Sequence, residues 1–184
     1  MDMKKFLVDA YFTEHEQKAK YMMGSSDPES LKLNDVISDL SKCENEQLGY
    51  ALGNGYPALR EKISTLYKNV NPNDIALMNG GEETIYVTMR ALLKPGDEIV
   101  VQMPSYQSLS VIAKEIGCNI TEYRPLFEEE WKFNIDALRT KITSKTKLLI
   151  LNYPHNPTGA CLTDDDMRQI TELCKEYNLY LIAE

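Results

Sequence analysis

Glycine, proline and long apolar runs are scarce in this sequence, and their scarcity excludes several classes of protein. Nine glycines and eight prolines among 184 residues are too few for a collagen-like or low-complexity chain, and 43% apolar residues are too many for a disordered one. Apolar runs such as residues 148–151 end far short of the roughly 20 residues that a membrane-spanning helix needs. The first six residues lead into polar, acidic sequence, so we expect no signal peptide and no membrane partner.

Positive charge and metal-binding side chains are scarce as well. Twenty Lys+Arg residues stand against 28 Asp+Glu residues, a formal net charge of −8, and no cationic cluster is present, which argues against nucleic acid as a partner. The four cysteines form no C-x-x-C pair and lie at Cys43, Cys118, Cys161 and Cys174. Because there are only two histidines, no zinc-binding spacing exists either. We therefore expect reduced thiols, no metal site and a cytoplasmic protein.

The pattern of the chain changes after about residue 47. Residues 1–47 read as an N-terminal arm and helix, with helix-like periodicity over 31–40. A Gly/Tyr/Asn-rich loop follows at 48–57, and Pro57 suits the first turn of a helix that continues to about residue 67. From residue 74 onward, strands alternate with helices. We expect strands at 75–78, 98–102, 119–123, 147–152 and 179–183, and helices at 82–93, 106–116, 135–142 and 163–177.

This alternation predicts an α/β fold: a mostly parallel sheet with helices on both faces, preceded by the helical arm. In such open sheets, ligands bind beyond the carboxyl ends of the strands. That rule selects four segments: residues 79–82, 104–106 and 152–159, and Glu184.

The turn at residues 79–84, Asn-Gly-Gly-Glu-Glu-Thr, leads from a predicted strand into a helix N-terminus. Its unpaired backbone N–H groups suit a phosphate. Alternatively, it is only a tight turn in which Glu82 and Glu83 complement the helix dipole. It contains neither G-x-G-x-x-G nor a Walker loop, which argues against dinucleotides and nucleoside triphosphates.

The other segments at this edge allow both a ligand-binding and a packing role. Tyr106 can stack on a flat heteroaromatic ring or simply pack. In residues 152–159, two prolines fix the backbone, so Asn152, His155 and Asn156 are held at the sheet edge, where an asparagine amide can donate to a phenolate-like oxygen. Glu184 can pair with a protonated ring nitrogen or be a surface residue.

In order and spacing, these segments resemble the fold-type-I pyridoxal-phosphate enzymes, the aspartate-aminotransferase-like class I/II aminotransferases. The resemblance runs from about residue 23 to residue 184. The matching segments are the loop around Tyr50 with Gly-Tyr-Pro-Ala-Leu-Arg at 55–60, then 79–83, Lys-Pro-Gly-Asp-Glu at 94–98, 104–106 and Pro-His-Asn-Pro-Thr-Gly at 154–159. Each segment alone is a weak signal, but all of them in the family's order form a specific one.

The resemblance implies pyridoxal 5′-phosphate as the cofactor and gives roles around its phosphate. The backbone amides of Gly81 and Glu82 match the pair that binds the phosphate, and Tyr50 matches the tyrosine that reaches it across a dimer interface. Gly24 falls near a glycine that lines the substrate site. Glu82 departs from the small hydroxyl residue or lysine of many relatives, so we expect its side chain to turn outward.

The resemblance also gives roles around the cofactor ring. Tyr106 matches the aromatic residue that stacks on the pyridine, and Asn156 matches the asparagine that hydrogen-bonds the ring hydroxyl oxygen. Glu184 falls where the family has an aspartate that keeps the ring nitrogen protonated. Glutamate supplies the same charge on a side chain that is one methylene longer.

These matches imply that residues 48–184 are part of the cofactor-binding large domain of an aminotransferase, with an amino acid and a 2-oxo acid as substrates and a homodimer as the assembly. The family's Schiff-base lysine, its substrate-binding arginine and its small C-terminal domain would lie beyond residue 184. The lysines at 94, 141, 145 and 147 do not match, so we expect this chain alone to be inactive. The alternatives are a non-catalytic binding or dimerisation domain, and an ordinary nucleotide-binding domain, which the missing glycine fingerprint disfavours.

Overall fold

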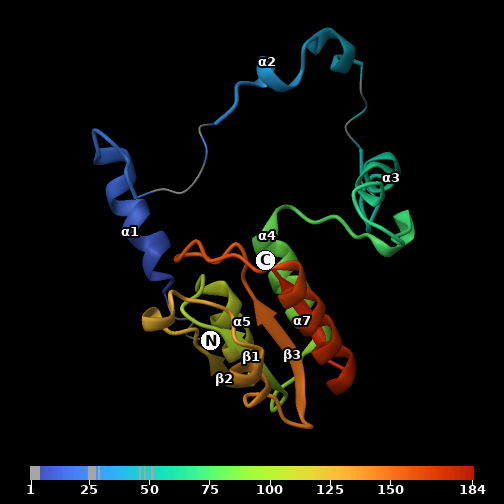
Figure 1. The fold of residues 1–184 in the computed structure, drawn as a ribbon. Helices are drawn as coiled ribbons and strands as arrows, with labels where there is room; N and C mark the ends of the chain where they lie inside the picture. Colours follow the sequence, from blue (N-terminus) through green and yellow to red (C-terminus); the bar gives the residue numbers. More distant parts are fainter. Residues whose placement is uncertain (1–4, 25–27, 29, 46, 48, 51) are drawn as a thin grey trace. The chain divides into compact units, whose positions relative to one another are not determined.

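A computed structural model describes residues 5–24, 28, 30–45, 47, 49–50 and 52–184 (Figure 1). The chain forms two compact units, one of Asn79–Glu184 together with the segment that ends at Phe6, and one of Leu7–Met78. The domain boundary predicted after residue 47 falls inside the second unit and stays a prediction. No helix in the described part of the chain is long and apolar enough to span a membrane.

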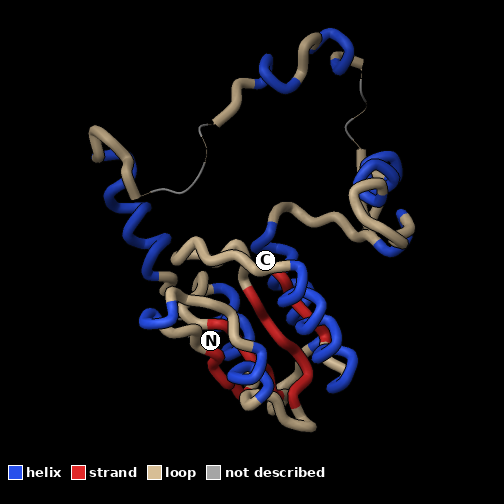
Figure 2. The backbone as a smooth tube through the Cα atoms, in the orientation of Figure 1, coloured by secondary structure: helices blue, strands red, loops and turns tan. Residues whose placement is uncertain are grey.

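Four parallel strands form the sheet of the first unit (Figure 2). They are β1 (Glu98–Gln102), β2 (Asn119–Tyr123), β3 (Thr146–Leu151) and β4 (Tyr180–Ala183), in the order β2-β1-β3-β4. Ile99 pairs with Ile120 of β2 and Leu148 of β3, so the strands start and stop nearly together. The parallel α/β arrangement predicted from the sequence is confirmed.

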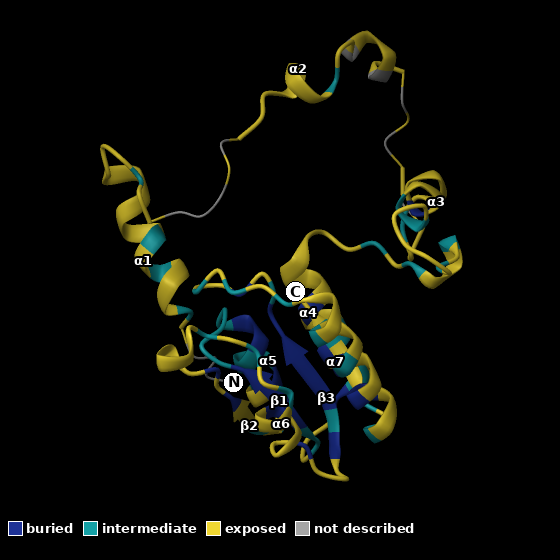
Figure 3. Cartoon of the chain, viewed as in Figure 1, coloured by how far each residue is buried: buried dark blue, intermediate teal, exposed yellow. Residues whose placement is uncertain are grey.

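Alternating strand residues face two different pairs of helices. Ile99 and Val101 of β1 pack with α4 (Gly81–Leu92) and α5 (Ser108–Ile116), whereas Val100 faces α6 (Ile135–Arg139) and α7 (Asp164–Tyr177). The residues of β3 alternate in the same way and are buried along most of the strand (Figure 3). This period of two produces a three-layer unit with one apolar cluster on each face of the sheet.

The helix ends follow local sequence signals. The Thr163 hydroxyl accepts a hydrogen bond from the Asp166 N–H at the start of α7, and the Asp166 carboxylate accepts one from the Thr163 N–H. This reciprocal capping box fixes the N-terminus of the helix where the sequence predicts it. Helix α5 ends at Ile116 and is capped by Gly117, whose φ of +94° lies in the left-handed region that glycine adopts without strain.

The unit Leu7–Met78 holds the helices α1 (Leu7–His15), α2 (Leu33–Val36) and α3 (Pro57–Ser64). The helix predicted over 31–40 was too long: Ile37 leaves helical geometry, and a short 3-10 turn, Leu40–Cys43, follows. Helix α3 starts at Pro57 as predicted, but it ends at Ser64 rather than near residue 67.

The strand predicted at 75–78 is wrong. A strand needs a neighbour that pairs with its backbone groups, and this segment belongs to none of the strand pairs in the described part of the chain. Instead, the Leu77 N–H donates to the Asn54 carbonyl at 3.2 Å. The loop comes so close that a Cβ on Gly55 would lie 2.5 Å from the Leu77 side chain, and Gly55 has a φ of +94°. The apolar run therefore packs on a glycine loop.

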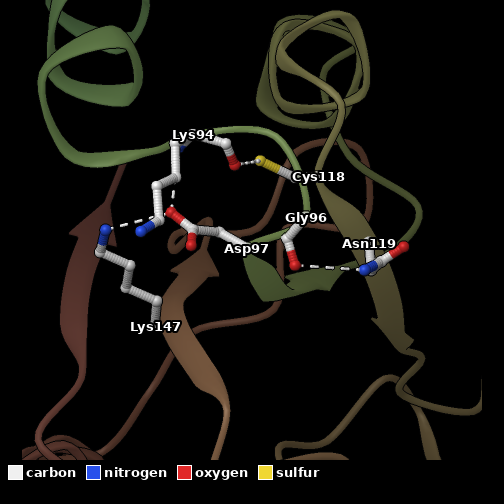
Figure 4. A network of polar contacts seen from close by, with 6 residues as sticks. All are labelled: Lys94, Gly96, Asp97, Cys118, Asn119 and Lys147. Carbon is white, nitrogen blue, oxygen red and sulfur yellow. Dashed lines mark hydrogen bonds and ion pairs between the residues drawn. The ribbon is translucent and has the colours of Figure 1, made fainter.

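A polar network fixes the amino-terminal ends of the strands (Figure 4). Asp97 Oδ2 accepts hydrogen bonds from the Lys94 N–H at 2.9 Å and from Lys147 Nζ at 3.0 Å, which joins the start of β1 to the start of β3. Asn119 Nδ2 donates to the Gly96 carbonyl at 3.3 Å, which joins the start of β2 to the turn that precedes β1. The hydrogen bond from the Lys94 backbone, followed by the one from Lys147, lowers the pKa of the Asp97 carboxyl.

We predict that Asp97→Asn lowers the melting temperature by a few degrees at neutral pH, because it removes the ion pair and weakens the cap of the turn. The pKa of Asp97 is lower in the folded state, so its contribution is present above the unfolded-state pKa of about 4 and is lost as the pH falls through the folded-state value. The difference between the Asp97→Asn variant and the unmodified protein should therefore shrink below about pH 4.

Thermal melts across pH, followed by circular dichroism, check this prediction. Glu172→Gln is the control, because Glu172 is an exposed carboxylate on α7. A difference in melting temperature that stays constant from pH 7 to pH 3 would contradict the assignment.

Candidate functional site

An open helix N-terminus lies at one end of the described site. Gly80 precedes α4 with a φ of +86° and, as a glycine, supplies no side-chain cap, while the Glu83 carboxylate accepts the Asn79 N–H at 2.5 Å. The N–H groups of Gly81 and Glu82 are in the first turn of α4, where an α-helix provides no internal partner. A Cβ on Gly80 or Gly81 would meet no atom within 4 Å, so other parts of the chain do not crowd these two glycines. This arrangement favours an anion at the turn.

The Glu82 side chain is exposed, and Ser108 fixes its direction. The Ser108 hydroxyl donates to Glu82 Oε1 at 3.0 Å, and Ser108 itself is fully buried at the start of α5. The contact links the first turns of α4 and α5. It also keeps the carboxylate close enough to the sheet edge for its charge to act on Glu184.

Tyr106 lies between the end of β1 and the start of α5. It is half-buried, packs against the apolar cluster that α4 and α5 share, and its carbonyl accepts a hydrogen bond from the Leu109 N–H at 3.2 Å. These contacts hold the aromatic residue at the carboxyl-terminal end of β1.

His155 joins the loop after β3 to the loop after β1. Its side chain is buried, with Nε2 2.7 Å from the Pro104 carbonyl oxygen and Nδ1 2.6 Å from the Thr158 hydroxyl. A carbonyl oxygen can only accept, so Nε2 carries a proton and donates it. His155 thereby fixes the loop that carries Asn156 to the segment that leads to Tyr106.

Asn152 contacts two of the predicted site residues. Its Oδ1 accepts from the Asn156 N–H at 2.6 Å, and its Nδ2 donates to Glu184 Oε2 at 2.8 Å. Glu184 follows β4 directly. Burial raises the pKa of its carboxyl; the hydrogen bond from Asn152 opposes that rise, and the charge of Glu82 adds to it. The Asn152 side chain therefore connects Asn156, in the loop after β3, with the carboxylate of Glu184.

The predicted site residues are divided between the two units. Gly81, Glu82, Tyr106, Asn156 and Glu184 all belong to the unit with the sheet, at the start of α4 or at carboxyl-terminal strand ends. Tyr50, which is fully exposed, and Gly24 belong to the unit Leu7–Met78. Their roles stay predictions.

Sequence reasoning gave no role to Ser108 or Gln102, which support this edge. Gln102 is buried and accepts the Asn152 N–H through Oε1 at 3.0 Å. A polar residue that ends an otherwise apolar strand was the available signal. Nothing in the local sequence around Ser108 distinguishes it from an ordinary residue of a helix start.

Comparison with known proteins decides the family. The family model described as "Aminotransferase class I and II" matches residues 20–184. The chain belongs to the class I and II aminotransferases. The family resemblance inferred from the order of the matching segments is therefore confirmed.

Several individual aminotransferases are similar to this chain. Kynurenine–oxoglutarate transaminase 3 of Rattus norvegicus is 31% identical over 73% of this chain and 33% of that protein. A crystal structure of a PLP-dependent aminotransferase from Streptococcus suis superposes with a TM-score of 0.92 at 27% identity, over 100% of this chain and 51% of that one. Aspartate aminotransferase from Thermus thermophilus with maleate gives a TM-score of 0.70 at 30% identity, over 73% and 37%. This aminotransferase chain thus spans about a third to a half of the relatives it matches.

We predict that His155→Ala lowers the free energy of unfolding of the sheet unit by about 2–4 kcal/mol, because it leaves the Pro104 carbonyl without its donor and opens a cavity. Trp131 is the only tryptophan and lies in the same unit, so its fluorescence during urea denaturation reports the change. The matched control is His15→Ala on the exposed face of α1, which should change stability by less than about 0.5 kcal/mol. Equal effects of the two substitutions would refute the bridging role of His155.

Proposed function

We propose that this chain is the cofactor-binding part of an aminotransferase and holds pyridoxal 5′-phosphate at the carboxyl-terminal edge of its sheet. The observation that carries the proposal is the convergence at this edge of an open helix N-terminus, an aromatic residue, an asparagine and a carboxylate, joined through Ser108, His155 and Asn152. When bound, pyridoxal phosphate supplies the electron sink for amino-group transfer.

The phosphate end of the proposed site rests on backbone donors. The N–H groups of Gly81 and Glu82 lie in the first turn of α4, where the helix provides no internal partner, and other parts of the chain do not crowd Gly80 or Gly81. Ser108 holds the Glu82 carboxylate, so the side chain leaves its own amide available. The negative charge of Glu82 nevertheless acts against an anion at this turn.

The ring end of the site rests on three side chains. Tyr106 would stack on the ring, Asn156 would donate its side-chain amide to the ring hydroxyl oxygen, and the Glu184 carboxylate would hold the proton of the ring nitrogen. The raised pKa of Glu184 fits this last role, because a partly desolvated carboxylate gains from a cationic partner.

The complete enzyme, in this proposal, transfers an amino group between an amino acid and a 2-oxo acid as a cytoplasmic homodimer. Tyr50 would reach the phosphate held by a partner subunit, and Gly24 would line the substrate site. The similar proteins are named for kynurenine, aspartate and other amino acids, so the proposal extends to amino acids as a class.

The 184 residues alone do not transaminate in this proposal. Lys94 precedes β1, and Lys141, Lys145 and Lys147 precede or begin β3, so these four lysines lie at the amino-terminal end of the sheet, opposite the proposed site. Their position also favours the second candidate, a non-catalytic binding or dimerisation domain. Transfer of amino groups by the purified chain would contradict both the inactivity of these 184 residues and the non-catalytic domain.

Binding of pyridoxamine 5′-phosphate tests the proposal directly. This amine form of the cofactor cannot condense with surface lysines, so it reports only the non-covalent site. We predict saturable binding to the chain, weakened about tenfold by Tyr106→Ala or by Asn156→Ala through lost stacking or a lost hydrogen bond. Tyr180→Ala, at the amino-terminal end of β4, is the matched control and should bind normally. Affinities that are equal in all four proteins, or no binding at all, would count against the site.

The charge of Glu82 gives a separate prediction. Glu82→Gln keeps an acceptor for Ser108 but removes the charge, so pyridoxamine 5′-phosphate should bind about three- to tenfold more tightly at low salt. The gain should shrink in high salt because the charges are partly exposed. Glu115→Gln in α5 is the control. Unchanged or weaker binding by Glu82→Gln would show that this carboxylate does not oppose the phosphate.

A further inference from the structure

Asn152 occupies a central position at the site edge, where its side chain contacts two of the predicted site residues. The side chain is 5% exposed and directly follows β3. Both ends of its amide are used: Oδ1 accepts from the Asn156 N–H, and Nδ2 donates to the Glu184 carboxylate. A backbone N–H can only donate and a carboxylate can only accept, so the two partners fix which end of the amide is which.

The neighbouring strand also fixes the Asn152 backbone. Gln102, at the end of β1 and 1% exposed, accepts the Asn152 N–H through Oε1 at 3.0 Å. Asn152 is therefore held from the β1 side through its main chain, and it reaches toward β4 with its side chain. Its position leaves little freedom for the groups that it contacts.

The sheet itself does not need the Asn152 side chain. Leu151 already pairs with Ala183, the Glu184 N–H donates to the Leu151 carbonyl at 3.1 Å, and the Tyr153 N–H donates to the Glu184 carbonyl at 2.9 Å. These backbone bonds hold the end of β4 beside β3. The bond from Nδ2 to the Glu184 carboxylate adds only a direction for that side chain.

We propose that Asn152 is a positioning residue that sets the distance and direction between Asn156 and Glu184 for a planar heteroaromatic ligand. The inference rests on the proposed function, in which Asn156 meets the ring hydroxyl oxygen and Glu184 meets the ring nitrogen. On the pyridoxal ring two ring carbons separate the hydroxyl oxygen from the ring nitrogen, and the flat ring holds these atoms at a fixed distance, so their partners must also keep a fixed spacing. One amide that bonds both partners supplies that spacing.

The test uses two variants that change the contacts of Asn152 with Asn156 and Glu184 in different ways. Asn152→Ala removes both contacts, whereas Asn152→Asp has nearly the same shape, keeps an acceptor for the Asn156 N–H and places a negative charge against Glu184. We expect carbon-13 NMR titration of the Glu184 side-chain carboxyl, without any ligand, to give a higher pKa in Asn152→Ala than in the unmodified chain. In Asn152→Asp, the coupled carboxyl pair should titrate higher still.

Ligand binding is the second readout. We expect the affinity for pyridoxamine 5′-phosphate to fall about tenfold in Asn152→Ala and further in Asn152→Asp. Asn119→Ala is the matched control, because it also removes one side-chain hydrogen bond of an asparagine, but at the amino-terminal end of the sheet. It should leave both the Glu184 titration and the affinity unchanged.

The outcomes separate this inference from the proposed function. If the unmodified chain binds no pyridoxamine 5′-phosphate, the proposed function fails, and the Glu184 titration alone decides the positioning role. An unmoved Glu184 pKa in both variants overturns that role. If circular dichroism shows that Asn152→Ala does not fold, the Glu184 pKa in the near-isosteric Asn152→Asp variant tests the positioning role instead. The unmodified chain gives a further test, because the NMR signals of its Asn152 side-chain amide protons must shift as Glu184 titrates. If the chemical shifts of these amide protons do not change during the titration of Glu184, the inference is also overturned.

Discussion

Parallel pairing of the four strands brings every strand's carboxyl-terminal end to the same edge of the sheet, and the rest of the described site depends on that constraint. Tyr106, Asn156 and Glu184 are far apart in the sequence, yet each follows a strand that ends there. The alternation of buried residues on β1 and β3 holds the alignment, because a shift by one residue would turn apolar side chains to the wrong helices.

The two ends of the sheet have different chemistry. At the amino-terminal end, Asp97 is bonded to Lys94 and Lys147, so donors and acceptors satisfy one another and fix the strand starts. At the carboxyl-terminal end, buried side chains such as Asn152 and His155 hold exposed groups in place. The first turn of α4, which its N-cap residue Gly80 does not cap with a side chain, lies there as well. One end thus fixes the sheet, and the other presents groups to a ligand.

Much of the sheet unit could be predicted from the sequence because its signals are local. The apolar run at 148–151 and the capping residues of α7 follow simple rules of burial and helix capping. The strand predicted at 75–78 failed because pairing depends on a neighbour, which an apolar run does not specify. Ser108 and Glu82 lie 26 positions apart in the sequence, and their hydrogen bond joins α5 to α4. No pattern in either segment predicts this contact. The roles of Tyr50 and Gly24 rest on the family resemblance alone.

We propose that the carboxyl-terminal edge of this sheet is a cofactor site. The most direct measurement is a backbone amide NMR spectrum of the isotope-labelled chain, recorded while pyridoxamine 5′-phosphate is added. We expect saturable shifts to concentrate at Gly81, Glu82, Tyr106, Asn156 and Glu184, while the signals of Lys94, Asp97 and Lys147 at the opposite end stay unmoved. Shifts that centre on the amino-terminal end of the strands, or a spectrum that does not change at millimolar ligand, would contradict this proposal.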